Sequence, residues 1–204
     1  MNKSKKFIYL ISPNKIKNNK FFKDLKEIFK TKKISYFQLR LKKENPIKII
    51  FYGKKIKKLC KKYKVKLIIN DFPLLAKKIN ADGCHLGQTD ISINKARKII
   101  KNKIIGLTCH NSIKLIKNAI DNGADYVALG AFYKSKTKKV KYKARIKLLK
   151  QVKKLTKVAI VAIGGIKFSN YKKLLLNNAN FLAISDYVWN NKKYTPVDAI
   201  KKLK

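Results

Sequence analysis

Acidic residues are scarce in this chain of 204 residues, which has 10 aspartates and glutamates against 52 lysines and arginines and a net charge of +42. Such a charge attracts nucleic acid without specificity. Arginine, however, occurs only at Arg40, Arg97 and Arg145. Since bidentate recognition of phosphates and bases favours arginine over lysine, we expect no specific nucleic-acid partner. We interpret most of the charge as a solvated lysine-rich surface, with a basic nucleic-acid-binding protein as an alternative.

Cysteines and long apolar runs are also few. Cys60, Cys84 and Cys109 form no CxxC pair, so the sequence predicts neither a disulfide framework nor a zinc site. The first apolar run, residues 7–12, is shorter than the core of a signal peptide. The longest other run, residues 158–166, is far shorter than the ~20 residues of a membrane span. We therefore predict reduced thiols, a cytoplasmic location and no membrane partner.

What the sequence does contain is a regular alternation of strand-like and helix-like segments. Strands are predicted at residues 7–12, 36–41, 66–70, 84–87, 104–109, 126–130, 158–164 and 181–185. Helices are predicted at residues 21–29, 47–63, 74–79, 93–100, 113–120, 146–155, 171–176 and 197–203. Strict alternation favours parallel strands with right-handed crossovers. We predict an α/β protein, a short (β/α)8 TIM barrel that forms a single domain over residues 1–204.

A short repeat supports eight such units. Residues 80–83, 123–126 and 178–181 have related sequences, and each stands where a helix ends and the fourth, sixth or eighth strand begins. A doubly wound open sheet is the alternative fold. No GxGxxG or GxxxxGK[ST] motif follows the first strand, so the usual fingerprint of that fold is missing.

In a TIM barrel, functional residues gather where the strands end and the loops toward the helices begin. The residues predicted to lie there include Gln38, Arg40, Lys42, Asn70, Asp71, Asp90, Thr108, Ser135, Thr137, Lys138, Gly164, Gly165, Ile184 and Ser185. Neither His85 nor His110 has an obvious serine or cysteine partner for a hydrolytic triad.

Asp71 and Asp90 follow adjacent predicted strands, although acidic residues are rare in this chain. Carboxylate oxygens suit a hard cation, and Mg²⁺ commonly takes one or two of them together with water and substrate phosphates. The alternative is that these aspartates cap the helices that begin near Pro73 and Ser92. The two roles predict different effects of an aspartate-to-asparagine substitution.

Gly164 ends the seventh predicted strand and Gly165 follows it, and the two can leave backbone N–H groups open to an anion. With Ser185, they would form a phosphate site at the loops after strands seven and eight. The alternative is a tight turn, for which glycine is the default residue. Arg40, Lys42 and Lys138 would neutralise further phosphate charge.

Seven stretches of the sequence together resemble thiamine phosphate synthases, and the resemblance covers nearly the whole chain. They are residues 38–42 (QLRLK), 69–71 (IND), 81–90 (ADGCHLGQTD), 106–108 (GLT), 123–127 (GADYV), 135–138 (SKTK) and 161–166 (VAIGGI). The resemblance implies a TIM-barrel transferase of thiamine biosynthesis. Such an enzyme joins 4-amino-2-methyl-5-hydroxymethylpyrimidine diphosphate to hydroxyethylthiazole phosphate and releases diphosphate.

The resemblance also implies roles for individual residues. Asp71 and Asp90 would hold Mg²⁺. The catalytic residues would be Arg40, Lys42, Thr108 and Lys138, of which Thr108 stands near the pyrimidine and the cations hold the diphosphate. The remaining substrate-binding residues would be Gln38, Asn70, Ser135, Thr137, Gly165, Ile184 and Ser185, the last three seating the thiazole phosphate.

The sequence departs from the family pattern at a few positions: Thr108 replaces a usual serine, Ser135 a usual threonine and Lys134 a usual proline, and Asp186 directly follows the expected phosphate seat. The related thiazole tautomerases are a further alternative, since they share the barrel and the glycine pair. They usually lack the HLGQxD pattern that this chain keeps at residues 85–90.

Overall fold

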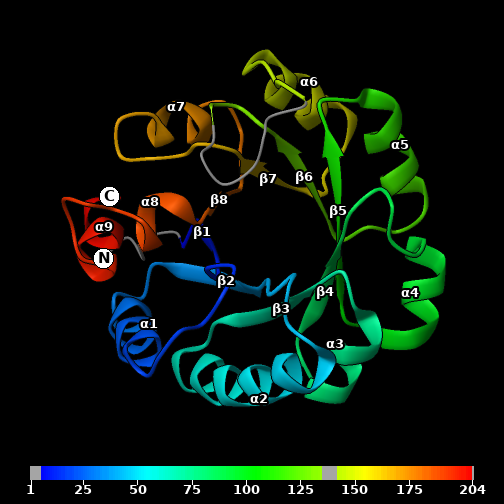
Figure 1. Cartoon of the computed structure of the whole chain (residues 1–204). Coiled ribbons are helices and arrows are strands. Elements are labelled where there is room, and N and C mark those ends of the chain that lie inside the picture. The colour runs from blue at the N-terminus through cyan, green and yellow to red at the C-terminus, as the bar shows by residue number, and fades with distance from the viewer. Residues whose placement is uncertain (1–5, 135–141, 204) are drawn as a thin grey trace.

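Eight parallel strands close into a barrel in the computed structural model, which describes residues 6–134 and 142–203 (Figure 1). The strands are β1 (Ile8–Ile11), β2 (Ile34–Leu39), β3 (Lys66–Asn70), β4 (Gly83–Leu86), β5 (Ile104–His110), β6 (Tyr126–Gly130), β7 (Ala159–Ile163) and β8 (Phe181–Ile184). Because β1 also pairs with β8, the sheet has no edge. The predicted TIM barrel is confirmed, and the open-sheet alternative is wrong.

Helices surround the barrel as an outer ring (Figure 1). They are α1 (Lys20–Lys30), α2 (Pro46–Tyr63), α3 (Pro73–Ile79), α4 (Ile93–Ile100), α5 (Ile113–Asp121), α6 (Lys147–Leu155), α7 (Tyr171–Leu175), α8 (Asp186–Trp189) and α9 (Pro196–Lys202). The sequence did not predict α8, a single turn after β8. The indole Nε1 of Trp189 donates to the carbonyl of Ile11 at 2.7 Å, which ties α8 to the end of β1.

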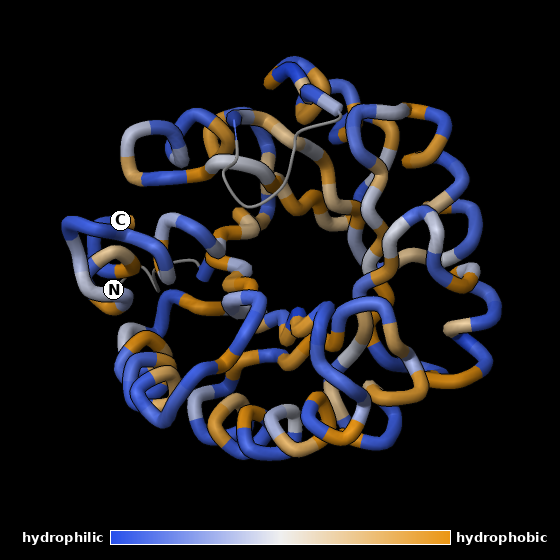
Figure 2. Tube along the Cα trace, in the orientation of Figure 1, coloured by the Kyte–Doolittle hydropathy of each residue, from blue (hydrophilic) through white to orange (hydrophobic). Residues whose placement is uncertain are grey.

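The apolar side chains form two layers, one between strands and helices and a smaller one inside the barrel. Figure 2 shows hydrophobic residues along the strands, while hydrophilic residues recur around the outer ring of helices. The inner cluster consists of Tyr9, Ile11, Ile68, Tyr126, Ala128, Val161 and Ala183. Aromatic side chains from β1 and β6 therefore meet inside the barrel, where Tyr9 and Tyr126 are in edge contact.

The repeat seen in the sequence forms one hydrogen-bonded clip at the amino-terminal ends of three strand pairs. In each clip, the residue before an even-numbered strand accepts a hydrogen bond from a backbone N–H near the start of the preceding strand. The oxygen-to-nitrogen distances are 2.7 Å for Asp82 and Leu67, 2.8 Å for Asp125 and Ile105, and 2.9 Å for Asn180 and Ile160. The repeat thus fixes the register of the strand pairs.

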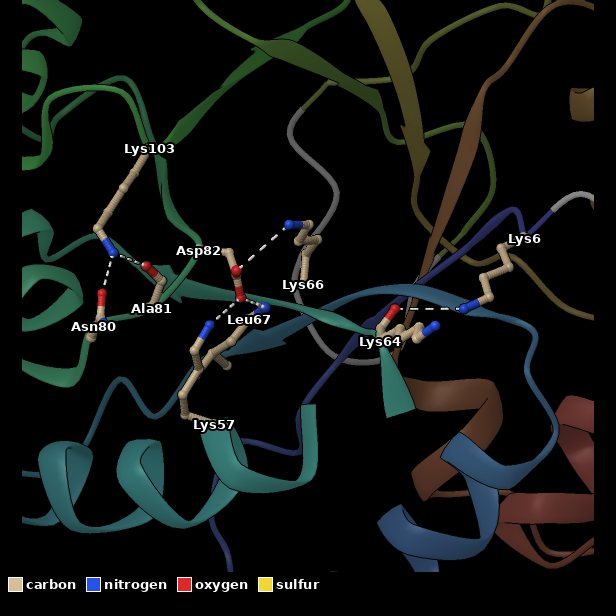
Figure 3. Close-up of polar contacts among 9 residues, drawn as sticks. All are labelled: Lys6, Lys57, Lys64, Lys66, Leu67, Asn80, Ala81, Asp82 and Lys103. Atoms are coloured by element: carbon tan, nitrogen blue, oxygen red, sulfur yellow. Dashed lines mark hydrogen bonds and ion pairs between the residues drawn. The ribbon is translucent and has the colours of Figure 1, made fainter. Parts of the chain in front are cut away.

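Lysines surround the first of these clips (Figure 3). Lys57 Nζ lies 2.7 Å and Lys66 Nζ 3.8 Å from the carboxylate of Asp82. Lys103 Nζ donates to Asn80 Oδ1 and to the carbonyl of Ala81, both at 2.6 Å. These lysines have defined structural partners at the end of the barrel away from the predicted site.

The remaining even-numbered strand is β2. The residue before it is Lys33, whereas the other three even-numbered strands are preceded by an aspartate or an asparagine. Its ammonium group donates to the carbonyls of Lys201 and Leu203, each at 2.8 Å. The first strand pair is therefore connected to the end of α9.

Among the described residues, no helix combines the length and apolar character that crossing a membrane requires.

Candidate active site

The predicted site residues within the described part of the chain lie at the carboxyl-terminal end of the barrel. They follow or end β2 (Gln38, Arg40, Lys42), β3 (Asn70, Asp71), β4 (Asp90), β5 (Thr108), β7 (Gly164, Gly165) and β8 (Ile184, Ser185). Ser135, Thr137 and Lys138 lie outside the described residues. Six of the eight strands therefore contribute to one end, as parallel strands in a closed barrel must.

Asp71 and Asp90 lie close enough to influence each other. Burial and the neighbouring Asp90 carboxyl group raise the pKa of Asp71, while Lys42 and Arg40 oppose the increase. Lys42 Nζ lies 3.6 Å from Asp71 Oδ2. Two carboxylates held together in this way repel each other unless a cation or a proton lies near them. Lys42 and Arg40 are the cations that lie beside this acidic pair.

The alternative that these aspartates cap helices is wrong. Phe72, not Asp71, occupies the N-cap of α3, and no side chain caps that helix. The N-cap of α4 is Ser92, whose hydroxyl accepts a hydrogen bond from Lys95 N. Asp71 instead has a left-handed backbone with φ 65°.

The carboxylate of Asp90 is oriented by the loop that follows β4. Its Oδ2 accepts a hydrogen bond from Gly87 N at 2.6 Å. One carboxylate oxygen of Asp90 is therefore bonded to the backbone of the loop that contains it. The acidic pair is consequently held by backbone geometry rather than by helix capping.

Arg40 is held beside the acidic pair by the loop after β1. Its Nη1 donates to Asn14 Oδ1 at 3.0 Å, and its backbone N donates to Ser12 Oγ at 2.9 Å. Burial lowers the pKa of the Arg40 guanidinium, while Asp71 raises it. Since arginine stays protonated at neutral pH, the mouth of the barrel carries a fixed positive charge next to Asp71.

The ends of β7 and β8 form a second, glycine-rich part of the mouth. Gly165 has φ 59°, and a Cβ atom there would lie 2.3 Å from the carbonyl oxygen of Lys134. Only glycine fits this close approach without a shift of the chain. Ser185 Oγ donates to the carbonyl of Ser12 at 3.3 Å, so β8 lies beside the loop that holds Arg40. The carboxylate of Asp186 accepts a hydrogen bond from Asn190 Nδ2 at 2.9 Å.

Gln38 and Thr108 lie at the two ends of a chain of hydrogen bonds inside the barrel. The chain runs from Gln38 Nε2 to Tyr9 Oη (3.0 Å), Tyr126 Oη (2.7 Å), His85 Nδ1 (2.9 Å), and from His85 Nε2 to Thr108 Oγ1 (2.8 Å). Burial lowers the pKa of His85 to about 4. The ring is therefore neutral at neutral pH.

Sequence reasoning did not assign Tyr9, His85 and Tyr126 to this site. A usable signal was present, because alternate residues of a barrel strand face inward. Gln38 and Thr108 face inward, and the strand register aligns His85 with Gly106 and Gly106 with Tyr126. Polar residues at inward positions of several strands thus indicated an internal network.

Comparison with known proteins decides the family. A family model described as thiamine monophosphate synthase matches residues 8–188. The chain belongs to the thiamine monophosphate synthase family. A relative named thiamine-phosphate synthase from Pelagibacter ubique (strain HTCC1062) is 67% identical over 201 residues, covering 98% of this chain and 97% of the relative.

Two further relatives agree with membership of the thiamine monophosphate synthase family. A thiamine-phosphate synthase from Nitrosomonas eutropha is 41% identical over 158 residues, which are 77% of this chain and 74% of that protein. The solved structure of thiamine phosphate pyrophosphorylase from Pyrococcus furiosus has a TM-score of 0.86 at 24% identity, covering 98% of this chain and 94% of that one. At this identity the structural match shows the shared fold. As a thiamine monophosphate synthase family member, the chain is a transferase of thiamine biosynthesis.

Proposed function

We propose that this protein condenses 4-amino-2-methyl-5-hydroxymethylpyrimidine diphosphate with hydroxyethylthiazole phosphate, giving thiamine phosphate and diphosphate. The observation that carries the proposal is the acidic pair Asp71 and Asp90 beside Arg40 and Lys42 at the barrel mouth. A mouth with both carboxylates and cations suits a diphosphate that arrives with a divalent metal ion. The identity of 67% to a thiamine-phosphate synthase supports the same reaction.

The donor set fits Mg²⁺. Asp71 and Asp90 offer two carboxylates close to each other, the number that Mg²⁺ commonly takes from protein while water and phosphate oxygens complete its octahedron. Bound there, Mg²⁺ would neutralise charge on the diphosphate. The close contact of Asp90 that raises the pKa of Asp71 is the observation that supports this fit.

The first substrate would be held by its diphosphate. Arg40 would bind it with a planar group that contacts two oxygens at once, and Lys42 would add a mobile positive charge. Asn70, buried at the end of β3, would supply an amide donor, and Lys138 a further cation. Thr108 would contact the pyrimidine from β5, and Gln38 would do so from β2. Ser135 and Thr137 would line the loop above both substrates.

The second substrate would be held by its phosphate at the ends of β7 and β8. The positive φ of Gly165 turns the backbone in a way that can expose its N–H group to an anion. Ser185 would add a hydroxyl, and Ile184 the adjacent apolar wall. This seat lies across the barrel mouth from the acidic pair, so both substrates can bind at once.

The reaction needs no nucleophilic side chain. The bond between the pyrimidine methylene carbon and the diphosphate oxygen breaks, and diphosphate leaves with the electron pair. The thiazole nitrogen then forms the new bond to that carbon. Arg40 and Lys42 would stabilise the departing negative charge, and the two seats would hold the nitrogen near the carbon.

The experiment is to incubate purified protein with both phosphorylated substrates and Mg²⁺ and to measure thiamine phosphate and diphosphate. We expect the two products in equal amounts and none when either substrate is omitted. A protein that isomerises a thiazole phosphate tautomer but forms no thiamine phosphate would be a tautomerase and would contradict the proposal. The cytoplasmic location and the single-domain organisation of residues 1–204 stay predictions.

A further inference from the structure

The chain of five side chains inside the barrel has a direction that can be read from its donors and acceptors. Gln38 Nε2 is a donor only, so Tyr9 Oη accepts from it. Within the described residues, the only other polar neighbour of the Tyr9 hydroxyl is Tyr126 Oη, 2.7 Å away. The Tyr9 proton therefore points to Tyr126.

The same count continues through the histidine. Since Tyr126 Oη accepts from Tyr9, its own proton points to His85 Nδ1. A neutral imidazole that accepts at Nδ1 carries its proton at Nε2, and that proton points to Thr108 Oγ1. The Thr108 hydroxyl is thereby occupied as an acceptor. Its own proton remains for a group in the mouth of the barrel.

The strand register leaves room for the rings of His85 and Tyr126 to lie side by side. His85 pairs with Gly106 on β5, and Gly106 pairs with Tyr126 on β6, so the glycine lies between the two rings. The His85 and Tyr126 rings are stacked, with centroids 5.6 Å apart and an interplanar angle of 13°. A Cβ atom at Gly106 would lie 1.9 Å from Tyr126 Cζ. The missing side chain is what lets the two rings meet.

We propose that Tyr126 and His85 are positioning residues that hold the Thr108 hydroxyl as a hydrogen-bond donor toward the barrel mouth. They thereby select a pyrimidine whose facing ring nitrogen is an acceptor. The inference rests on the proposed function, in which Thr108 contacts the pyrimidine. Neither residue touches the substrate in this account.

The chemistry that this selects is the amino form of the ring. In a 4-aminopyrimidine, both ring nitrogens carry lone pairs and can accept a proton from Thr108. In the 4-oxo analogue, one ring nitrogen carries hydrogen, so a donor faces a donor if that nitrogen meets Thr108. A site built around one hydrogen bond rejects an analogue that cannot make it, by up to ~10⁴-fold. The fixed direction of the chain thus discriminates against a deaminated substrate.

The first test reads the histidine directly and needs no substrate. The protein has two histidines, so ¹⁵N-labelled imidazole signals can be assigned by comparison with His110→Gln. We expect His85 to be protonated at Nε2 in the unsubstituted protein, and to become a mixture of tautomers in Tyr126→Phe. A proton on Nδ1 in the unsubstituted protein would reverse the chain and overturn the proposal.

The second test is kinetic. Tyr126→Phe should lower kcat/KM for the pyrimidine diphosphate by about 10-fold, the effect of one hydrogen bond, and reduce the preference for the amino over the 4-oxo substrate. The KM for thiazole phosphate should not change. Tyr36→Phe is the matched control. Tyr36 also lies inside the barrel, and the centroid of its ring is 6.2 Å from that of Tyr126. Its hydroxyl is not part of the chain of hydrogen bonds.

A third pair of variants separates the hydroxyl from packing. Thr108→Val keeps the shape and removes the donor, so the preference for the amino substrate should be lost, whereas Thr108→Ser should retain it. Equal loss toward both substrates in Tyr126→Phe, or an unchanged preference in Thr108→Val, would overturn the positioning role. Failure of the unsubstituted protein to form thiamine phosphate would count against the proposed function instead, and the tautomer measurement would still stand.

Discussion

His85 Nδ1 lies 2.9 Å from the hydroxyl oxygen of Tyr126, inside the barrel and within a stacked pair of rings. The imidazole is buried, and its pKa is lowered from 6.5 to about 4. The folded protein therefore binds a proton at this residue less readily than the unfolded chain does. Stability depends on pH for that reason.

We expect the free energy of unfolding to fall as the pH falls from about 6.5 toward 4, because the unfolded state gains a proton that the folded state excludes. The His85 contribution should amount to about 2 kcal/mol between pH 7 and pH 5. Urea unfolding at the two pH values measures it. His85→Gln should lose this part of the pH dependence and His110→Gln should keep it; the same slope in all three proteins would contradict the assignment.

Asp71→Asn and Asp90→Asn should each keep the fold and lower the coupling rate by ~10²-fold or more, because a charge that holds the metal on the leaving diphosphate is removed. Steady-state rates across a range of Mg²⁺ concentrations measure the loss, and excess Mg²⁺ or Mn²⁺ should restore part of it. Asp121→Asn, on an exposed residue at the end of α5, is the matched control. A full rate with unchanged metal dependence in both site variants would rule out the metal site.

Ser185→Asp should raise the KM for thiazole phosphate more than that for the pyrimidine diphosphate. A carboxylate at the end of β8 would repel the phosphate of the second substrate, whereas the acidic pair lies across the mouth. Initial rates with each substrate varied in turn measure the effect. Ser185→Ala, which removes only the hydroxyl, should change the KM less, and equal increases for both substrates would contradict the assigned seat.

Asp82→Ala should destabilise the protein by about 1–3 kcal/mol, because the backbone N–H of Leu67 loses its acceptor and Lys57 loses its ion-pair partner. Asp82→Asn should cost less, since asparagine already serves as this acceptor at Asn180. Urea unfolding compares the two variants. If alanine and asparagine were equally harmful, the hydrogen bond would not be the source of the stability.

Nucleic-acid binding, if any, should be weak and indifferent to sequence, because the lysines are spread over the surface and arginine is scarce. Fluorescence anisotropy with two unrelated oligonucleotides over a range of salt concentrations measures it. We expect similar affinities that fall steeply with salt. Submicromolar, sequence-selective binding at physiological salt would favour the nucleic-acid-binding alternative.

The fold was predictable from the sequence because each strand and helix has a local pattern and the units repeat in order. All sixteen predicted segments are found with boundaries within two residues. The four-residue helix α8 escaped prediction, since one turn is too short to establish a helical period. The residues at the strand ends were likewise identifiable, because the fold alone determines which end of the barrel they share.

The hydrogen-bonded chain was harder to foresee because its members are far apart in sequence. Tyr9 and Tyr126 are 117 positions apart and touch only once the barrel has closed. Capping by Asp71 was predicted as an alternative from its position before Pro73, but its left-handed backbone turns the residue away from that role. The position of a residue in the chain does not reveal such a turn.

Lys33 makes the ring of strands uneven. Three strand pairs are fastened by an aspartate or asparagine side chain, whereas in the first pair Ser35 Oγ donates to the carbonyl of Lys6 and Lys33 donates to the carbonyls of Lys201 and Leu203. The contact between β1 and β2 is therefore the one that also depends on the end of α9. Opening of β1 and β2 should accompany release of α9 as one cooperative unit, so that early local unfolding involves both ends of the described chain and leaves the remaining strands in register.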